Sequence, residues 1–160
     1  MEDDSQEDVK VKLKRLFSGW HHPIPEFIDK TEHIIKNRIT DRIPVKGWTK
    51  GNVILLGDAA HPSTPNLGQG GCMAIEGAYI LAKSINKYGL SKKAYDRYEE
   101  LQFPRSQMIV KESLKMGQMG QLSNPVFAFI RNLAFKLIPS KLSVKMVDKF
   151  FSYRVNKLDI

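Results

Sequence analysis

The chain has 160 residues, 42% of them apolar, which fits one globular domain or a part of a larger one. No apolar run approaches the ~20 residues of a membrane-spanning helix, the acidic N-terminus lacks the features of a signal peptide, and a single cysteine excludes an internal disulfide, so we expect a cytoplasmic protein. The formal net charge of +8 is scattered along the chain without a recognised DNA-binding motif, which argues against a nucleic-acid partner.

The first part of the chain predicts two helices and two strands. Apolar spacing indicates an amphipathic helix over residues 9–20, with Ser5 as a candidate N-cap, and a short helix over 26–31. Isoleucines and basic residues alternate over 34–43, which predicts a half-buried strand. The four consecutive apolar residues 53–56 then predict a fully buried central strand of a parallel sheet.

The rest of the chain predicts helices. A glycine-rich turn leads into a helix over residues 71–88, which ends at Gly89, and a long helix follows over 92–116. Asn124 and Pro125 begin another helix, and a last one opens near residue 140. The fold class is therefore α/β and helix-rich, with too few strands for the parallel sheet that a buried strand needs.

The turn between the strand and the helix has the residues of a ligand site. Asp58 lies just beyond the carboxyl end of the predicted strand, where open α/β sheets bind ligands, and its carboxylate can accept hydrogen bonds from a polyol. Pro65 offers a flat apolar wall, and glycines at 68, 70 and 71 let the backbone approach a ligand. The free N–H groups at the start of the following helix favour a negative charge. These features suit a ligand with a polyol, a planar ring and an anionic edge.

Three segments of this region carry a family resemblance. Residues 57–61 read GDAAH, residues 65–70 read PNLGQG and residues 74–78 read AIEGA. They resemble the second FAD-binding motif of the single-component flavin-dependent aromatic hydroxylases and epoxidases, G-D-A-A-H, P-x-x-G-Q-G and A-x-E-D-A, and are especially similar to the zeaxanthin epoxidase branch. Residues 48–53 resemble the W-x-x-G-x-V lead-in, and residues 98–105 resemble Y-E-x-x-R-x-P-R. The resemblance covers most of residues 10–120.

The resemblance implies FAD as cofactor, NAD(P)H as its reductant, and oxygen transfer from O2 to a small organic substrate. By position, Asp58 would bind the ribityl chain, Pro65 would pack beside the reactive edge of the flavin, and the N–H groups from about Gly70 to Met73 would face its pyrimidine edge. We expect no catalytic side chain in this chain. We also expect no metal ligand, because the adjacent His21 and His22 do not share a helix or strand face and no carboxylate pattern follows them. The expected cofactor-binding residues are Gly57, Asp58, Pro65, Gly68, Gln69, Gly70, Gly71, Cys72 and Met73.

Four positions near the motif need separate interpretation. Gly77 replaces the usual Asp and Gln102 replaces the usual Arg, so we expect an ion pair of the family to be absent. His61 could carry protons, but a structural role in the turn is favoured. Cys72 could be a nucleophile at a helix N-terminus, but a small packing residue is favoured because no His or Asn pattern surrounds it.

The chain corresponds to only a part of the family's fold. It has no G-x-G-x-x-G and no middle Asp-Gly motif. We therefore expect residues 1–120 to be the C-terminal part of an FAD/NAD(P)-binding, para-hydroxybenzoate hydroxylase-like domain, with the N-terminal Rossmann half missing. The chain would then be inactive alone, and the missing half, as a separate chain, is a candidate partner.

Residues 121–160 predict a basic amphipathic helical tail. From residue 125 onward it has five phenylalanines and seven basic residues against two acidic ones. Such a segment can lie on an anionic membrane surface, through residues 125–160, or cover the hydrophobic face of the missing half. The alternative to an enzyme part is a non-catalytic helical module for interaction or membrane-surface binding, which keeps the motif as an element of its fold.

Overall fold

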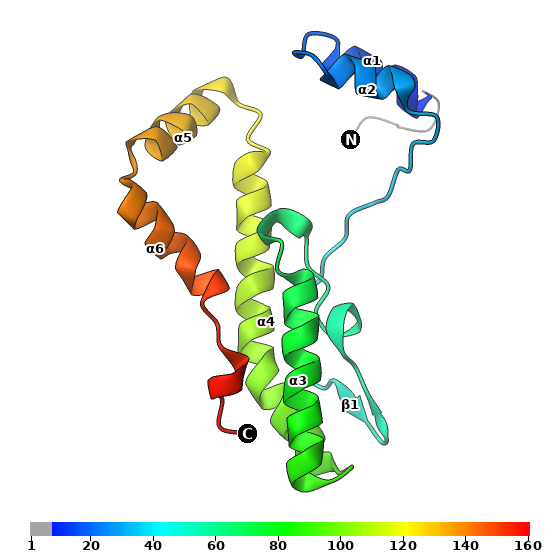
Figure 1. Ribbon diagram of the computed structural model, residues 1–160, viewed down its shortest axis with the longest axis vertical. Coiled ribbons are helices and arrows are strands. Elements are labelled where there is room, and N and C mark those ends of the chain that lie inside the picture. Colours follow the sequence, from blue (N-terminus) through cyan, green and yellow to red (C-terminus); the bar gives the residue numbers. More distant parts are fainter. Residues whose placement is uncertain (1–7) are drawn as a thin grey trace. The chain divides into compact units, whose positions relative to one another are not determined.

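The computed structural model describes residues 8–160 (Figure 1). The chain consists of two compact units, residues 1–39 and 40–160. The first unit is a pair of short helices, α1 (Val9–Phe17) and α2 (Ile24–Lys30), which confirms both predicted helices. The candidate cap Ser5 lies outside the described residues. Asp8 caps α1, because its carboxylate accepts hydrogen bonds from the N–H groups of Lys10 and Val11 at 2.7 and 3.3 Å.

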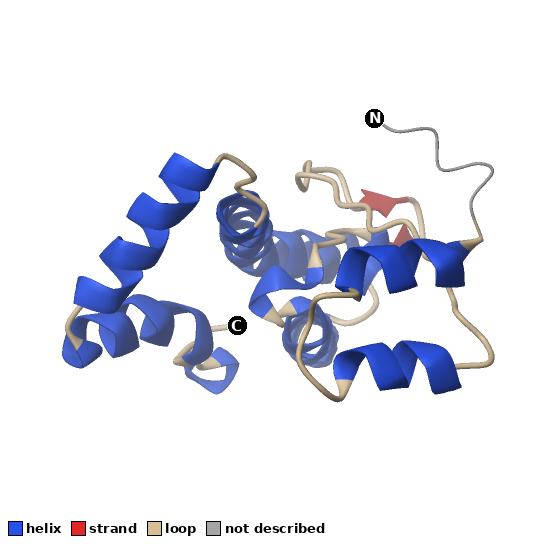
Figure 2. Ribbon diagram, turned by 90° about the horizontal axis from the view of Figure 1, so that it is seen from above, coloured by secondary structure: helices blue, strands red, loops and turns tan. Residues whose placement is uncertain are grey.

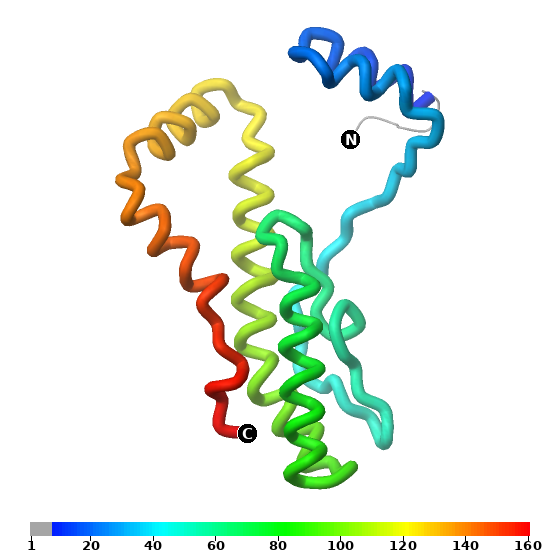
Figure 3. Tube along the Cα trace, viewed as in Figure 1, coloured from blue at the N-terminus to red at the C-terminus, as the bar shows by residue number. Residues whose placement is uncertain are grey.

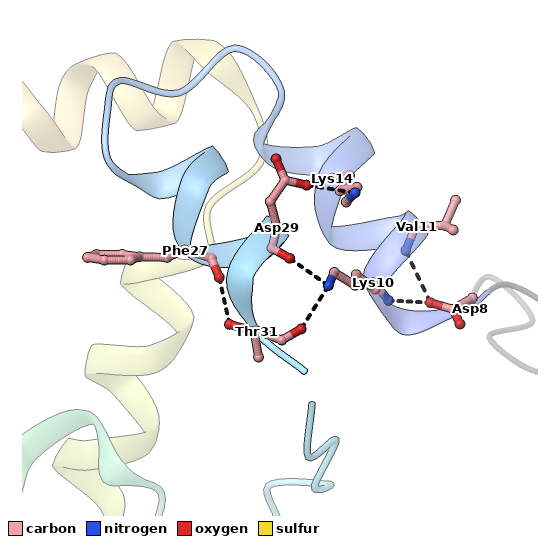
Figure 4. Close-up of polar contacts among 7 residues, drawn as sticks. All are labelled: Asp8, Lys10, Val11, Lys14, Phe27, Asp29 and Thr31. Carbon is pink, nitrogen blue, oxygen red and sulfur yellow. Dashed lines mark hydrogen bonds and ion pairs between the residues drawn. The ribbon is translucent and has the colours of Figure 1, made fainter. Parts of the chain in front are cut away.

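Two lysines of α1 hold α2 beside it (Figure 4). Lys10 Nζ donates to the carbonyl oxygens of Asp29 and Thr31, both at 2.8 Å, and so satisfies acceptors at the C-terminal end of α2. Lys14 pairs with the Asp29 carboxylate at 2.6 Å and lowers the pKa of that carboxyl. Both helices are half-exposed, so these polar contacts supplement little apolar burial.

Residues 34–43 do not form the predicted strand. They have no regular secondary structure, and their isoleucines face outward, with Ile35 81% and Ile39 66% exposed. A strand needs a neighbouring strand that completes its backbone hydrogen bonds, and in the described part of the chain no strand pairs with this segment. The segment therefore has the alternating side chains of a strand but not the strand pairing.

The predicted buried parallel strand is also wrong. β1 (Thr49–Lys50) and β2 (Val53–Ile54) form a two-stranded antiparallel hairpin, in which Thr49 lies opposite Ile54 (Figure 2). Val53 is 66% exposed, and Leu55 and Leu56 are also exposed. A central parallel strand is buried because strands flank it on both sides, and within residues 8–160 only β1 lies beside β2.

The second unit is built on two long helices that run side by side in opposite directions, as Figure 3 shows. α3 (Gly70–Tyr88) ends at Gly89, whose φ of +71° is suited to glycine, and α4 (Lys92–Gly120) begins at the capping residue Ser91. Both helices confirm the predictions. Two buried clusters join them. The Trp48 cluster consists of Trp48, Ala60, Ile80 and Tyr98. The Met73 cluster consists of Met73, Ile109, Val110 and Phe150.

Two further helices, α5 (Pro125–Leu137) and α6 (Ser140–Phe151), lead away from α4 and back (Figure 1). Asn124 caps α5 as predicted, and no residue of α5 is buried. α6 places Phe150 in the Met73 cluster, and the last residues pack on the Trp48 cluster through Val155, Leu158 and Ile160. Among the described residues, no helix combines the length and apolar character needed to cross a membrane.

Candidate functional site

The turn after β2 is closed by a glycine that packs directly on α3. Gly57 has a φ of +59° and begins a short 3₁₀ helix, η1 (Gly57–Ala59). Its carbonyl oxygen accepts hydrogen bonds from the N–H groups of Ala60 and His61, both at 2.9 Å. A Cβ at Gly57 would lie 3.4 Å from the Cβ of Ala74 on α3. This close approach fixes the turn and leaves the Asp58 side chain exposed beside the start of α3.

The next loop is fixed to α4 by three polar side chains. Pro65 opens a second 3₁₀ helix, η2 (Pro65–Leu67), just after Thr64. The Ser113 hydroxyl donates to the Thr64 carbonyl at 2.7 Å, and the two hydroxyls lie 2.9 Å apart. Asn66 Nδ2 donates to the Ser113 carbonyl at 3.1 Å. Gly68, with a φ of +63°, then turns the chain into α3.

These turns enclose an open concavity of about 460 Å³. Five of the nine predicted residues line it, so the structure brings the core of the sequence motif together. Sequence reasoning did not find the other three lining residues, which lie in the loop before Pro65 and one turn into α3. The lining residues are Asp58, Ser63, Thr64, Pro65, Gly68, Gly70, Gly71 and Ala74.

The remaining predicted residues lie around this concavity rather than on its wall. Gly57 and Gln69 are buried, and Met73 is fully buried in the Met73 cluster. Cys72 is exposed in the first turn of α3, so the packing role that we favoured for it is not observed. Each of these four residues flanks a lining residue or continues its helix.

The first turn of α3 supplies backbone donors to the concavity. The N–H groups of Gly70, Gly71 and Cys72 precede the first intrahelical bond, and no acceptor in the described part of the chain is bonded to them. The N–H of Met73 donates to the Gln69 carbonyl at 2.9 Å. Three of the four expected N–H groups are therefore available to a ligand, at the end of the helix where the dipole favours negative charge.

The concavity has room where side chains would otherwise be. A Cβ at Gly68 or Gly71 would meet no atom within 4 Å, whereas a Cβ at Gly70 would come within 3.2 Å of the Ser63 hydroxyl oxygen. The glycines therefore leave open space at the wall and allow a close backbone turn. Asp58 is the one charged side chain among the lining residues. An open wall with a carboxylate, a proline and helix N–H groups fits a flat ring that carries a polyol.

His61 has the structural position that we favoured. Its side chain is fully buried, and its ring lies 5.6 Å from that of Trp48. Burial lowers the pKa of His61, although the carboxylates of Asp58 and Glu76 oppose this shift. Within residues 8–160, neither ring nitrogen has a hydrogen-bond partner. A neutral imidazole in this position fills the space under the turn and does not reach a ligand.

The two departures from the family pattern are adjacent in the structure. Gly77 lies in the buried face of α3, where a Cβ would approach Leu56 at 3.2 Å and Tyr98 at 3.4 Å. Gln102 of α4 is fully buried and donates from Nε2 to the Met73 carbonyl at 3.0 Å. A hydrogen bond from the neutral side-chain amide of Gln102 therefore lies at the contact between α3 and α4. This agrees with our expectation that the family's ion pair is absent there.

A larger hollow of about 1020 Å³ lies elsewhere on the second unit, between the β hairpin and α4. Charged surface residues such as Lys46, Asp96 and Glu100 line it, and none of the predicted site residues does. The smaller concavity is the candidate site because residues of the sequence motif line it.

Comparison with known proteins shows the family of the chain. The FAD binding domain family matches residues 2–113, and the chain belongs to this family. The cofactor of this family is FAD. The residues that line the concavity lie within the part of the chain that this family matches.

Relatives narrow the family further. The chain is 39% identical to the aurachin C monooxygenase/isomerase of Stigmatella aurantiaca over 135 residues, which are 83% of this chain and 35% of that protein. It is 44% identical over 108 residues to the chloroplastic zeaxanthin epoxidase of an Oncidium hybrid cultivar, covering 66% of this chain and 15% of the epoxidase. The chain thus spans about a third or less of the length of these relatives.

A solved structure shares the fold. The crystal structure of Klebsiella pneumoniae HpxO complexed with FAD and uric acid superposes with a TM-score of 0.78 at 24% identity. The superposition covers 91% of this chain and 39% of HpxO. The arrangement of helices described above is therefore that of the corresponding part of a larger FAD-binding fold, which confirms the predicted fold class.

Proposed function

We propose that this chain forms the part of an FAD-dependent monooxygenase that holds the isoalloxazine ring and ribityl chain, for NAD(P)H- and O2-dependent hydroxylation or epoxidation of a small organic substrate. The observation that carries the proposal is the concavity in which Asp58, Pro65 and the N–H groups at the start of α3 converge. The names of the monooxygenase and epoxidase relatives support the reaction class.

Each residue has a defined task in this proposal. The Asp58 carboxylate accepts hydrogen bonds from ribityl hydroxyls, and Pro65 packs against the ring. The N–H groups of Gly70, Gly71 and Cys72 donate to the pyrimidine edge and stabilise negative charge there. When bound, FAD supplies the oxidation chemistry, and the chain supplies orientation, electrostatics and exclusion of water.

The proposal includes a half-site, that is, a site for the isoalloxazine and ribityl end of FAD without one for the adenine end. The 160 residues contain no G-x-G-x-x-G, and the concavity is lined on one side by glycines that leave it open. The chain alone then holds flavin weakly and oxidises nothing, and a polypeptide with a dinucleotide-binding motif completes the site around the adenine end. This polypeptide is the partner that the proposal requires.

The experiment compares flavins with and without the adenine end. FMN and FAD are titrated into the purified chain, followed by flavin fluorescence and by amide spectra of the chain with labelled glycine. We expect both to bind with similar, weak affinity, and ADP not to compete. Asp58→Ala should weaken binding about tenfold, since it removes hydrogen bonds to a charged group. Asp96→Ala, in the unrelated hollow, is the matched control.

Two results would contradict the proposal in different ways. A flavin that copurifies in stoichiometric amount would exclude a half-site. If millimolar FMN leaves the amide signals of Gly68, Gly70 and Gly71 unchanged, the concavity does not bind the isoalloxazine end at all.

A second candidate function, contact with an anionic membrane surface, is favoured by one feature of α6. Its lysines recur at positions 141, 145 and 149 along one side of the helix, while exposed apolar residues such as Val144, Val147 and Phe151 follow another. Co-sedimentation with anionic lipid vesicles at low salt tests this candidate. A chain that stays in the supernatant under these conditions excludes it.

A further inference from the structure

One buried cation connects the candidate site to the rest of the second unit. The Arg105 side chain, in the middle of α4, is only 3% exposed. Its Nε donates to Glu76 Oε2 at 3.1 Å, and its Nη2 donates to Glu76 Oε1 at 3.2 Å. The guanidinium and the carboxylate of α3 thus form a two-point pair, the geometry that compensates a buried charge best.

The same guanidinium reaches two further elements. Its Nη2 also donates to the side-chain oxygen of Gln69 at 3.3 Å and to the carbonyl oxygen of Phe150 at 2.9 Å. The ring of Tyr153 lies 4.4 Å from its central carbon. Arg105 therefore contacts the residue that immediately precedes α3, the second turn of α3, and the end of α6 at once.

The segment 68–71, which leads into α3, needs such a contact because its own side chains do not fix its backbone. Gln69 is the N-cap residue, and its side chain makes no capping hydrogen bond. Gly68, Gly70 and Gly71 around it have no side chain to restrict the backbone. The hydrogen bonds of Thr64 and Ser113 hold only the beginning of this loop. The far end of the loop, which aims the N–H groups of α3, is held through Gln69.

We propose that Arg105 is a positioning residue for the flavin site, which fixes the first turn of α3 by joining Gln69 and Glu76 to the C-terminal end of α6. This inference rests on the proposed function for the ligand, but the order of the loop is independent of it. Lysine cannot replace arginine here, because one ammonium group lacks the planar fork that serves Glu76, Gln69 and the Phe150 carbonyl together.

The experiment uses the full chain with labelled glycine and three variants. Arg105→Lys keeps the positive charge, Gln69→Met removes the loop contact but leaves the pair with Glu76, and Arg97→Gln is the matched control. Arg97 lies on the same helix, pairs with Glu100 at 2.9 Å and bonds the Asp159 carbonyl, but does not contact the loop. Amide order parameters are measured without flavin, and FMN affinity is measured afterwards.

We expect the amides of Gly68, Gly70 and Gly71 to fall from order parameters of about 0.85 to below about 0.6 in Arg105→Lys and Gln69→Met. Gly89 and Gly120 should keep their values, which distinguishes local positioning from a general loss of structure. FMN affinity should weaken about tenfold in both variants and stay unchanged in Arg97→Gln.

The outcomes separate this inference from the proposed function. If the wild-type chain binds no FMN, the proposed function fails, and the flavin-free order of the three glycines still decides the role of Arg105. If the glycine amides keep their order in both variants, Arg105 does not position the turn. If order is lost while FMN affinity is unchanged, the positioning does not act on the flavin and the inference is overturned. Because Gln69→Met keeps the buried ion pair, a variant of Arg105 that fails to fold does not prevent the test.

Discussion

At the scale of single residues, His61 should make the stability of the protein depend on pH. Burial holds its pKa below the ordinary value of 6.5, so the unfolded chain binds a proton at a higher pH than the folded chain does. Stability is therefore fully present above about pH 6.5 and is lost as the pH falls toward the lowered folded pKa. For one proton the slope cannot exceed about 1.4 kcal/mol per pH unit.

Urea unfolding between about pH 7 and pH 5 measures this dependence. His61→Leu should flatten it, because leucine fills the site without a titrating group, whereas His33→Leu in the exposed segment should leave it intact. The carboxyls of Glu26 and Glu112 also have lowered pKa values, but they start from 4.5 and act at lower pH. An unchanged slope in His61→Leu would assign the dependence to another group.

Gly77 and Gln102 should be energetically coupled. Gly77→Asp alone places a charge in the buried contact between α3 and α4, close to Leu56 and Tyr98, and should lower the free energy of unfolding by about 3 kcal/mol. Gln102→Arg alone also buries an unpaired charge. The double variant should lose less than the sum of the two, because each charge then has an oppositely charged partner on the neighbouring helix. Strict additivity in urea unfolding would show that the two sites cannot pair in this fold.

At the scale of elements, the N-caps of α4 and α5 should have different consequences. Asn124 caps α5 by accepting from the N–H groups of Val126 and Phe127, and no residue of this helix is buried. Asn124→Ala should therefore cost about 1 kcal/mol of local helix stability, seen as faster amide exchange in α5, without moving the global unfolding midpoint. Ser91→Ala, at the packed helix α4, should lower the midpoint instead. Equal behaviour of the two variants would show that α5 unfolds together with the core.

The helices could be predicted from sequence because their signals are local. Ser91, Gly89 and Asn124 act on backbone groups within one turn, and the structure confirms all three. The strands could not be predicted, because pairing depends on segments distant in sequence. The isoleucines of 34–43 alternate as a strand would, but nothing in the described residues pairs with them.

In the candidate site, too, the features that are local in sequence could be predicted and those that depend on distant contacts could not. Asp58, Pro65 and the glycines were found because they belong to one contiguous motif, in which spacing alone predicts a turn and a helix start. Ser63 and Thr64 have no motif signal of their own, and Thr64 is placed by hydrogen bonds to Ser113 of α4. Arg105 belongs to the motif at residues 98–105, but its contacts depend on the packing of three helices. Its role could therefore not be predicted from the sequence.

At the scale of the whole molecule, the second unit contains everything that the proposed site requires. Both buried clusters, the concavity and Arg105 lie within residues 46–160, and the first unit has its own polar contacts between α1 and α2. The segment that joins the units has no regular secondary structure up to residue 48. The fold of the second unit should therefore not depend on the first.

Limited proteolysis tests this independence. Trypsin should cut first after Lys36 and Arg38, because both residues are exposed and have no secondary structure, whereas Arg42 is tied to the loop of the second unit through the carbonyl oxygens of Ala59 and Pro62. Cleavage should precede any cut in α3 or α4 and release a fragment of residues 39–160.

That fragment should unfold at the same urea midpoint as the intact chain, since its buried clusters are complete. The double variant Lys36→Gln with Arg38→Gln, which lacks both of these trypsin sites, should delay the first cut. A fragment that loses cooperative unfolding would show that the two helices of the first unit stabilise the second.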